Sequence, residues 1–171
     1  ILRVGVRNNL ITERDGASHS WLSMNSYIDI FTEDPELERN FSNLYNELSW
    51  HPLPWVKFGL EAQFPFASSG SGFSEYSTTT TFMPNRSTEI TVGYNYLNSH
   101  PTLEDSSRVD IRAYSRFNEK WGASFYQRWE LDDGTMESQQ YSVHRDLGSW
   151  SASLGVIRRD NRIKNELGVM L

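Results

Sequence analysis

Apolar and polar residues alternate with a period of two along most of the chain. Between residues 56 and 64, one set of alternate positions holds Val56, Phe58, Leu60, Ala62 and Phe64, and the other holds Lys57, Gly59, Glu61 and Gln63. The same alternation recurs over 90–96, 109–117, 121–131 and 150–156. Strict alternation is typical of β-strands that turn one face to an apolar environment and the other to water.

The pattern predicts eleven antiparallel strands. We expect them at 1–13, 19–32, 41–51, 54–65, 73–83, 88–98, 107–118, 120–131, 137–147, 149–158 and 163–171. Most of these strands are longer than the roughly five or six residues that are usual in soluble sheets. They match the roughly 9–11 residues with which a tilted strand crosses a bilayer.

The predicted connections alternate in length. Short connections follow the third, fifth, seventh and ninth strands, at His51–Leu53, Pro84–Arg86, Asn118–Glu119 and Gly148. Longer polar connections follow the even-numbered strands, at Glu33–Asn40, Ala67–Gly72, Asn98–Ser106, Asp132–Met136 and Arg159–Arg162. Outer-membrane barrels have short periplasmic turns and longer extracellular loops. The first connection, around Asp15–Gly16, is intermediate. On this interpretation the last strand runs toward the periplasm, and Leu171 lies on that side.

The tryptophans fall near the predicted strand ends. We expect an interfacial aromatic girdle made of Trp21, Trp50, Trp55, Trp121, Trp129 and Trp150,. Residues 1–171 are therefore predicted to form one all-β domain, an antiparallel up-and-down wall of a transmembrane β-barrel in the bacterial outer membrane. Eleven is an odd number and bacterial barrels have even ones, so we expect a segment of a larger barrel. A ten- or twelve-stranded barrel and a soluble β-sandwich remain the alternatives.

Composition narrows the classes of function. Hydrophobic residues make up 37% of the chain, aromatic residues 13%, and the mean hydropathy is −0.59, which suits a sheet with one apolar and one wet face. The chain has no run of about 18 apolar residues that would form a transmembrane helix. It has no cysteine, which excludes a disulfide framework and a thiolate metal site,. The net charge of −6 argues against a nucleic-acid partner,.

The predicted inward face is polar and carries both signs of charge. Its members, which could contact glycan hydroxyls or phosphates, are Arg3, Arg7, Asp29, Glu47, Lys57, Glu61, Asp110, Arg112, Tyr114, Arg116, Arg128 and Glu130,. Ser142, His144 and Asp146 also face inward, but residues two apart in a strand lie nearly 7 Å from one another, too far for a catalytic triad. The other histidines lack metal-ligand spacing. We predict no catalytic residue, cofactor or metal.

Four stretches carry a resemblance to a known family. They are Val4–Gly16, the Trp50-His51-Pro52-Leu53-Pro54-Trp55 turn within Leu48–Trp55, Gly93–Tyr96, and Phe117–Trp121 together with Gln140–Trp150. In their order and spacing they resemble the C-terminal barrel region of the LPS-assembly outer-membrane protein family (LptD). Many members carry cysteines near the last stretch and this chain has none, so disulfide control does not carry over. The soluble periplasmic domain of the family is not among these residues.

The resemblance implies transport of lipopolysaccharide to the outer leaflet. In that family the glycan passes through a polar lumen, and the lipid leaves by a lateral opening between the first and last strands, so residues 164–171 are expected near a gate edge. It also implies a plug lipoprotein and periplasmic transport proteins as partners, beside outer-membrane lipid. A passive porin-like channel is the alternative. A small-barrel hydrolase would need a serine and a histidine paired across neighbouring strands.

Overall fold

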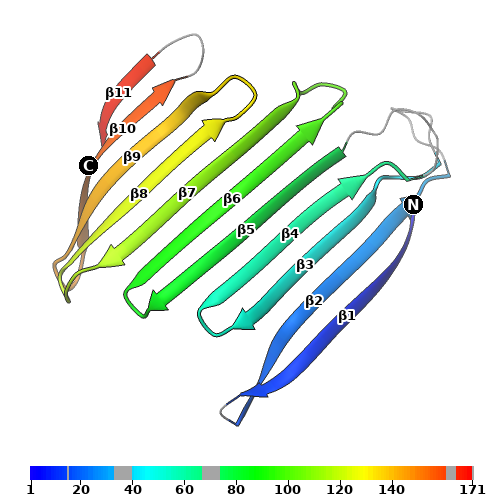
Figure 1. Ribbon diagram of the computed structural model, residues 1–171, viewed down its shortest axis with the longest axis horizontal. Helices are drawn as coiled ribbons and strands as arrows, with labels where there is room; N and C mark the ends of the chain where they lie inside the picture. Colours follow the sequence, from blue (N-terminus) through cyan, green and yellow to red (C-terminus); the bar gives the residue numbers. More distant parts are fainter. Residues whose placement is uncertain (15, 33–39, 67–73, 161–164, 171) are drawn as a thin grey trace. The chain divides into compact units, whose positions relative to one another are not determined.

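The chain folds into a single layer of antiparallel strands. The computed structural model describes residues 1–14, 16–32, 40–66, 74–160 and 165–170. The strands are β1 (Leu2–Arg14), β2 (Ala17–Ile30), β3 (Leu44–Leu53), β4 (Val56–Phe64), β5 (Ser74–Asn85), β6 (Thr88–Asn98), β7 (Ser106–Arg116), β8 (Trp121–Glu130), β9 (Thr135–Asp146), β10 (Ser151–Asp160) and β11 (Asn165–Met170). Their order in the sheet is their order in the chain (Figure 1). The predicted all-β, up-and-down sheet of eleven strands is confirmed.

The described residues contain no helix long and apolar enough to cross a membrane.

Two compact units make up the fold. Unit 1 comprises Ile1–Thr79 and Asn95–Ser106, and unit 2 comprises Thr80–Tyr94 and Ser107–Leu171. The division cuts β5 and β6, so each unit holds one end of both strands. Unit 1 contains β1 to β4 whole, and unit 2 contains β8 to β11 whole together with β7 from its second residue, Ser107.

In unit 1 the strand register gathers apolar side chains on one face. Residues directly opposite each other in an antiparallel pair point to the same side, and the strand register aligns Leu10, Leu22, Trp50 and Phe58 across four strands. The apolar face of unit 1 comprises Leu2, Val4, Val6, Leu10, Leu22, Met24, Ile28, Leu44, Leu48, Trp50, Phe58, Leu60, Ala62 and Phe64. Alternate positions of the same strands, such as Arg3, Tyr27, Tyr45 and Glu61, form the polar face of unit 1.

Unit 2 repeats this division. Pairs such as Ala113 with Phe125, Phe125 with Tyr141, and Tyr141 with Val156 build an apolar face. That face comprises Val109, Ile111, Ala113, Ala123, Phe125, Trp129, Tyr141, Val143, Ala152, Leu154, Val156, Leu167 and Val169. Between these positions lies the polar face of unit 2, which includes Arg112, Tyr114, Ser124 and His144.

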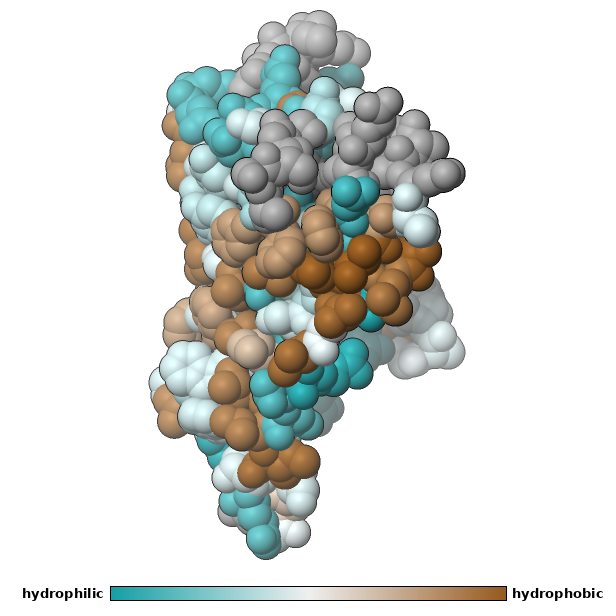
Figure 2. Space-filling view, turned by 90° about the vertical axis from the view of Figure 1, so that its right-hand side faces the viewer, coloured by the Kyte–Doolittle hydropathy of each residue, from teal (hydrophilic) through white to brown (hydrophobic). Residues whose placement is uncertain are grey.

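Neither apolar face is covered in the part of the chain that the structure describes. Ala62 is the one buried apolar residue there, and Leu10, Leu154 and Val169 are 52%, 57% and 70% exposed. Viewed from the side of β1, brown apolar side chains gather across the middle, whereas the lowest tip is teal (Figure 2). The described residues therefore form no second layer of the kind against which a soluble domain buries its apolar face,.

Short and long connections alternate as predicted as far as residue 105, whereas the four connections after it contain four residues each. In unit 1 the short connections are 15–16 and 54–55, and the longer ones are 31–43, 65–73 and 99–105. In unit 2 residues 86–87, 117–120 and 147–150 connect strands at one end, and 131–134 and 161–164 at the other. The connection that the sequence left undecided, at 15–16, is thus one of the short ones.

Candidate functional site

All twelve residues predicted to face inward lie on the polar face of their own unit. Unit 1 carries Arg3, Arg7, Asp29, Glu47, Lys57 and Glu61 on that face, and unit 2 carries Asp110, Arg112, Tyr114, Arg116, Arg128 and Glu130. The register brings several of them into direct contact. Two polar surfaces result, and their chemistry differs.

In unit 1 a stack of side chains crosses three strands. Asp29 accepts two hydrogen bonds from Arg3, from Nε at 2.7 Å and from Nη2 at 2.9 Å. The Arg3 guanidinium lies 4.2 Å from the centre of the Tyr27 ring. Tyr27 in turn stacks on Tyr45, with centroids 5.0 Å apart and an interplanar angle of 16°. Such cation–π and offset-stacked contacts hold the rings in place.

Beside this stack, unit 1 carries three glutamates on neighbouring strands. Glu47 and Glu61 lie directly opposite each other on β3 and β4, an arrangement that is unfavourable for two carboxylates. Asn25 Nδ2 donates to Glu47 at 3.0 Å, and the Gln63 amide donates to Glu75 on β5. Among the described residues around these glutamates, no Lys or Arg forms an ion pair with any of the three.

The polar face of unit 2 is braced by ion pairs. Arg112 Nε lies 3.3 Å from the Asp110 carboxylate, which is nearly buried against Gly93, where a Cβ would meet the carboxylate at 2.8 Å. Glu130 is also nearly buried, and its carboxylate accepts from the Ser107 N–H at 2.7 Å. Asp110 thus pairs with an arginine of its own strand, whereas Glu130 joins β8 to β7.

Tyr126 lies between two guanidinium groups. Arg112 and Arg128 approach its ring centre at 5.4 Å and 5.7 Å. Arg112 contacts the Asp110 carboxylate, and its guanidinium together with that of Arg128 gives this part of unit 2 the means to counter an anionic group,. The positive charge of this surface is opposite to the negative charge of the three glutamates in unit 1.

Neighbouring strands also bring a serine and a histidine together. Ser124 Oγ on β8 lies 2.8 Å from His144 Nε2 on β9, and Tyr114 lies over the same imidazole with its ring 6.0 Å away. Nucleophilic catalysis also needs an orienting group on the second imidazole nitrogen and donors for an oxyanion. In the described residues no carboxylate lies on His144 Nδ1, and the N–H groups of the surrounding strand belong to the β-ladder. The pair is a satisfied hydrogen bond.

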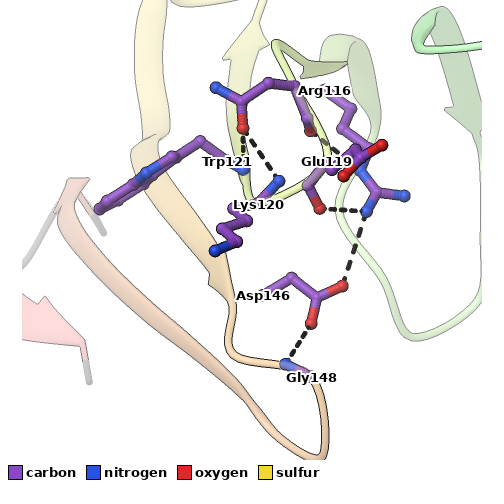
Figure 3. A network of polar contacts seen from close by, with 7 residues as sticks. Arg116, Glu119, Lys120, Trp121, Asp146 and Gly148 are labelled. Carbon is purple, nitrogen blue, oxygen red and sulfur yellow. Dashed lines mark hydrogen bonds and ion pairs between the residues drawn. The ribbon is translucent and has the colours of Figure 1, made fainter.

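A polar network joins two short connections of unit 2 (Figure 3). Arg116 donates to the backbone carbonyls of Asn118 and Glu119, and it lies 3.5 Å from the Asp146 carboxylate. Asp146 accepts from the Gly148 N–H at 2.8 Å. The Asn118 side chain accepts from the N–H groups of Lys120 and Trp121. Arg116, predicted to face a lumen, thus fixes the ends of two hairpins.

Five of the six tryptophans lie near the 15–16, 54–55, 117–120 and 147–150 connections. Trp55 and Trp150 lie within such connections, and Trp121 is the first residue of β8. Trp21 is the extra residue at an irregularity of the β1–β2 pairing, and its ring contacts that of Trp50 edge to face. Trp129 lies near the opposite end of β8. The Arg145 guanidinium covers the Trp121 ring at 4.9 Å.

The apolar faces also hold polar side chains that the sequence pattern did not reveal. Ser26 and Asn46 lie opposite each other in unit 1, and Ser26 donates to Asn46 at 2.8 Å. In unit 2, Gln127 and Gln139 both donate to the Tyr141 hydroxyl. Each group thereby satisfies part of its hydrogen-bonding capacity on an otherwise apolar surface.

The acidic residues of the longer connections fall into two groups. Glu33, Asp34, Glu36 and Glu38 lie outside the described residues. Asp105 accepts from the Ser99 N–H and Asp133 from the Thr135 N–H, so both carboxylates cap their turns. No group of three or more acidic or histidine side chains in the described part of the chain is arranged to hold a metal ion.

Comparison with known proteins finds no match, whether with models of protein families, with curated proteins or with solved structures.

Proposed function

We propose that the chain forms part of the wall of an outer-membrane β-barrel, and that this barrel moves lipopolysaccharide to the outer leaflet. The observation that carries the proposal is the uncovered apolar face opposite a polar one in each unit. Monomeric soluble proteins rarely expose contiguous apolar patches larger than a few hundred Å². A surface of this kind is stable where hydrocarbon covers it and water fills the other side.

The strand lengths support a bilayer as that cover. Strands β8 and β10 contain 10 residues each, and ten residues of antiparallel strand extend about 34 Å. A strand of this length tilted by about 45° rises about 24 Å, which is close to the roughly 25 Å apolar band of outer-membrane barrels.

The edges of the sheet support a larger barrel. Among the described strands, β1 pairs with β2 and β11 with β10, each on one side. An unpaired strand edge in hydrocarbon costs several kcal/mol for each backbone group. Further strands would therefore pair with β1 and β11.

The cargo and partners rest on the resemblance of Leu48–Trp55 and of the segment from Phe117 to Trp150 to the LPS-assembly family. It supports lipopolysaccharide as cargo, with a plug lipoprotein and periplasmic transport proteins as partners. A lumen lined by both signs of charge suits a molecule that carries hydroxyls and phosphates.

Photo-crosslinking tests the proposal on a single strand. A photoreactive amino acid replaces Tyr114, on the polar face of β7, or Ile111, on its apolar face, in the full-length protein in its own cells. We expect lipopolysaccharide adducts at Tyr114 and phospholipid adducts at Ile111. Phospholipid at Ile111 without lipopolysaccharide at Tyr114 would leave the barrel standing and indicate a passive channel. Protein adducts alone at Ile111 would contradict the barrel.

A further inference from the structure

A hollow on the polar face of unit 1 has the features of a saccharide site. Its volume is about 250 Å³, and Tyr45, Glu47, Glu61, Gln63 and Glu75 contribute to its lining. A second hollow of about 620 Å³ shares Glu47, Glu61 and Ser77 with the first and extends toward Arg7. Together they form a groove across β3, β4 and β5. Pockets for small ligands are commonly about 300–1,000 Å³, so the groove has room for a short oligosaccharide.

The wall of the first hollow is a prearranged aromatic platform. Asp29 fixes Arg3, Arg3 covers Tyr27, and Tyr27 covers one face of the Tyr45 ring. Tyr45 lines the hollow together with Gln63, the residue opposite it on β4, and a ligand is expected to use the part of the ring face that Gln63 leaves open. A pyranose ring presents a flat patch of C–H groups that packs on such a face. Because the platform is held before binding, little side-chain entropy is lost.

The remaining lining groups determine which saccharide fits. Glu47, Glu61 and Glu75 are hydrogen-bond acceptors when ionised, and sugar hydroxyls and ammonium groups are donors. None of the three forms an ion pair with Lys or Arg in the described residues around the groove. In the first hollow a phosphorylated or carboxylated sugar would therefore meet three like charges, whereas Arg7 lines the second hollow,.

We propose that this groove binds a neutral or amine-bearing saccharide, with one pyranose ring on Tyr45 and hydroxyl groups donating to Glu47 and Glu61. The site rests on the proposed function in one respect, that the polar face of unit 1 is open to water. It deepens that function by giving this surface a preference against anionic sugars, whereas Arg112 and Arg128 in unit 2 can counter anions.

Binding of three trisaccharide probes to the full-length protein in detergent tests the proposal. The probes are maltotriose, which is neutral, the glucosamine trimer, which carries amines, and trigalacturonate, which is anionic. Saturation-transfer NMR reports which sugar protons contact the protein, and titration gives the affinity. We expect the first two probes to bind and trigalacturonate not to bind.

Substitutions locate the binding. Tyr45→Leu removes the platform and is expected to weaken maltotriose binding about tenfold, whereas Tyr45→Phe retains the ring and the affinity. Glu61→Gln removes one charge and is expected to weaken binding of the glucosamine trimer and to admit trigalacturonate. Tyr141→Leu, which removes a tyrosine from the apolar face of unit 2, is the matched control and should leave all three affinities unchanged.

The outcomes separate this inference from the proposed function. No binding of maltotriose or the glucosamine trimer would overturn it, even where Tyr114 is crosslinked to lipopolysaccharide. Equal binding of trigalacturonate would overturn the charge preference, and unchanged binding by Tyr45→Leu would overturn the platform. Saccharide binding that depends on Tyr45 would support the groove even if no lipopolysaccharide adduct formed at Tyr114.

Discussion

Single glycines allow large side chains to lie across neighbouring strands on the polar faces. Gly5 lies beside Tyr27, and a Cβ built at Gly5 would meet the Ser26 carbonyl oxygen at 2.6 Å and Tyr27 Cβ at 2.7 Å. Gly122 leaves similar room for the Tyr114 hydroxyl, which an added Cβ would meet at 3.0 Å. At both positions a tyrosine from the adjacent strand occupies the space, so the glycine and the ring act as a pair.

The Gly5 contact gives a prediction for stability. Gly5→Ala should destabilise the protein by about 1–3 kcal/mol, because its neighbours are backbone and a Cβ, which cannot rotate away. Gly59→Ala is the matched control. The added methyl would meet only the Thr79 hydroxyl, so a rotamer change should keep the cost below about 1 kcal/mol. The midpoint of urea unfolding in detergent measures both variants. Equal midpoints for the two variants would contradict this account.

At the scale of elements, Arg116 joins the β7–β8 and β9–β10 connections. Its contribution should come mainly from the carbonyls of Asn118 and Glu119, because the ion pair with Asp146 is about half exposed, at 48% and 51%. We expect Arg116→Ala to cost about 1–2 kcal/mol. Asp146→Asn should cost less, since the amide oxygen still accepts from the Gly148 N–H.

A double-mutant cycle separates these contributions. The coupling between Arg116→Ala and Asp146→Asn should be about 0.2–1 kcal/mol, the range of exposed ion pairs. Arg116→Lys is the control, because a lysine retains the charge but lacks the planar fork that reaches two carbonyls. A coupling above about 2 kcal/mol, or full stability in Arg116→Lys, would show that the ion pair dominates.

The elements themselves could be predicted from the sequence, but the contacts between them could not. All eleven strands were predicted within a few residues, because a two-faced strand leaves a period of two in the sequence. The Ser124–His144 pair depends on a register shift between Arg128 and Trp129. Without it, His144 would move to the other face. Tyr27 and Tyr45 are separated by residues 31–43, so only the β2–β3 register brings them together.

At the scale of the whole molecule, what covers the apolar faces decides between a membrane barrel and a soluble sandwich. Both folds alternate apolar and polar residues, so both agree with the strand pattern. They differ in the neighbour of a residue such as Leu154 in β10, which is 57% exposed and paired with Val143. A barrel wall places acyl chains there, and a sandwich places side chains of a second sheet.

A lipid-borne quencher distinguishes these neighbours. The 171 residues hold no cysteine, so Leu154→Cys introduces the one thiol of this region, and Ser153→Cys, on the polar face of the same strand, is its control. Each thiol is labelled with a small fluorophore, and the protein is placed in vesicles of brominated phospholipid. We expect strong quenching at position 154 and weak quenching at 153, with water-soluble iodide giving the reverse order, because acyl chains exclude iodide. Weak quenching by both agents at position 154 would mean that a protein layer covers this face, and the barrel would be wrong.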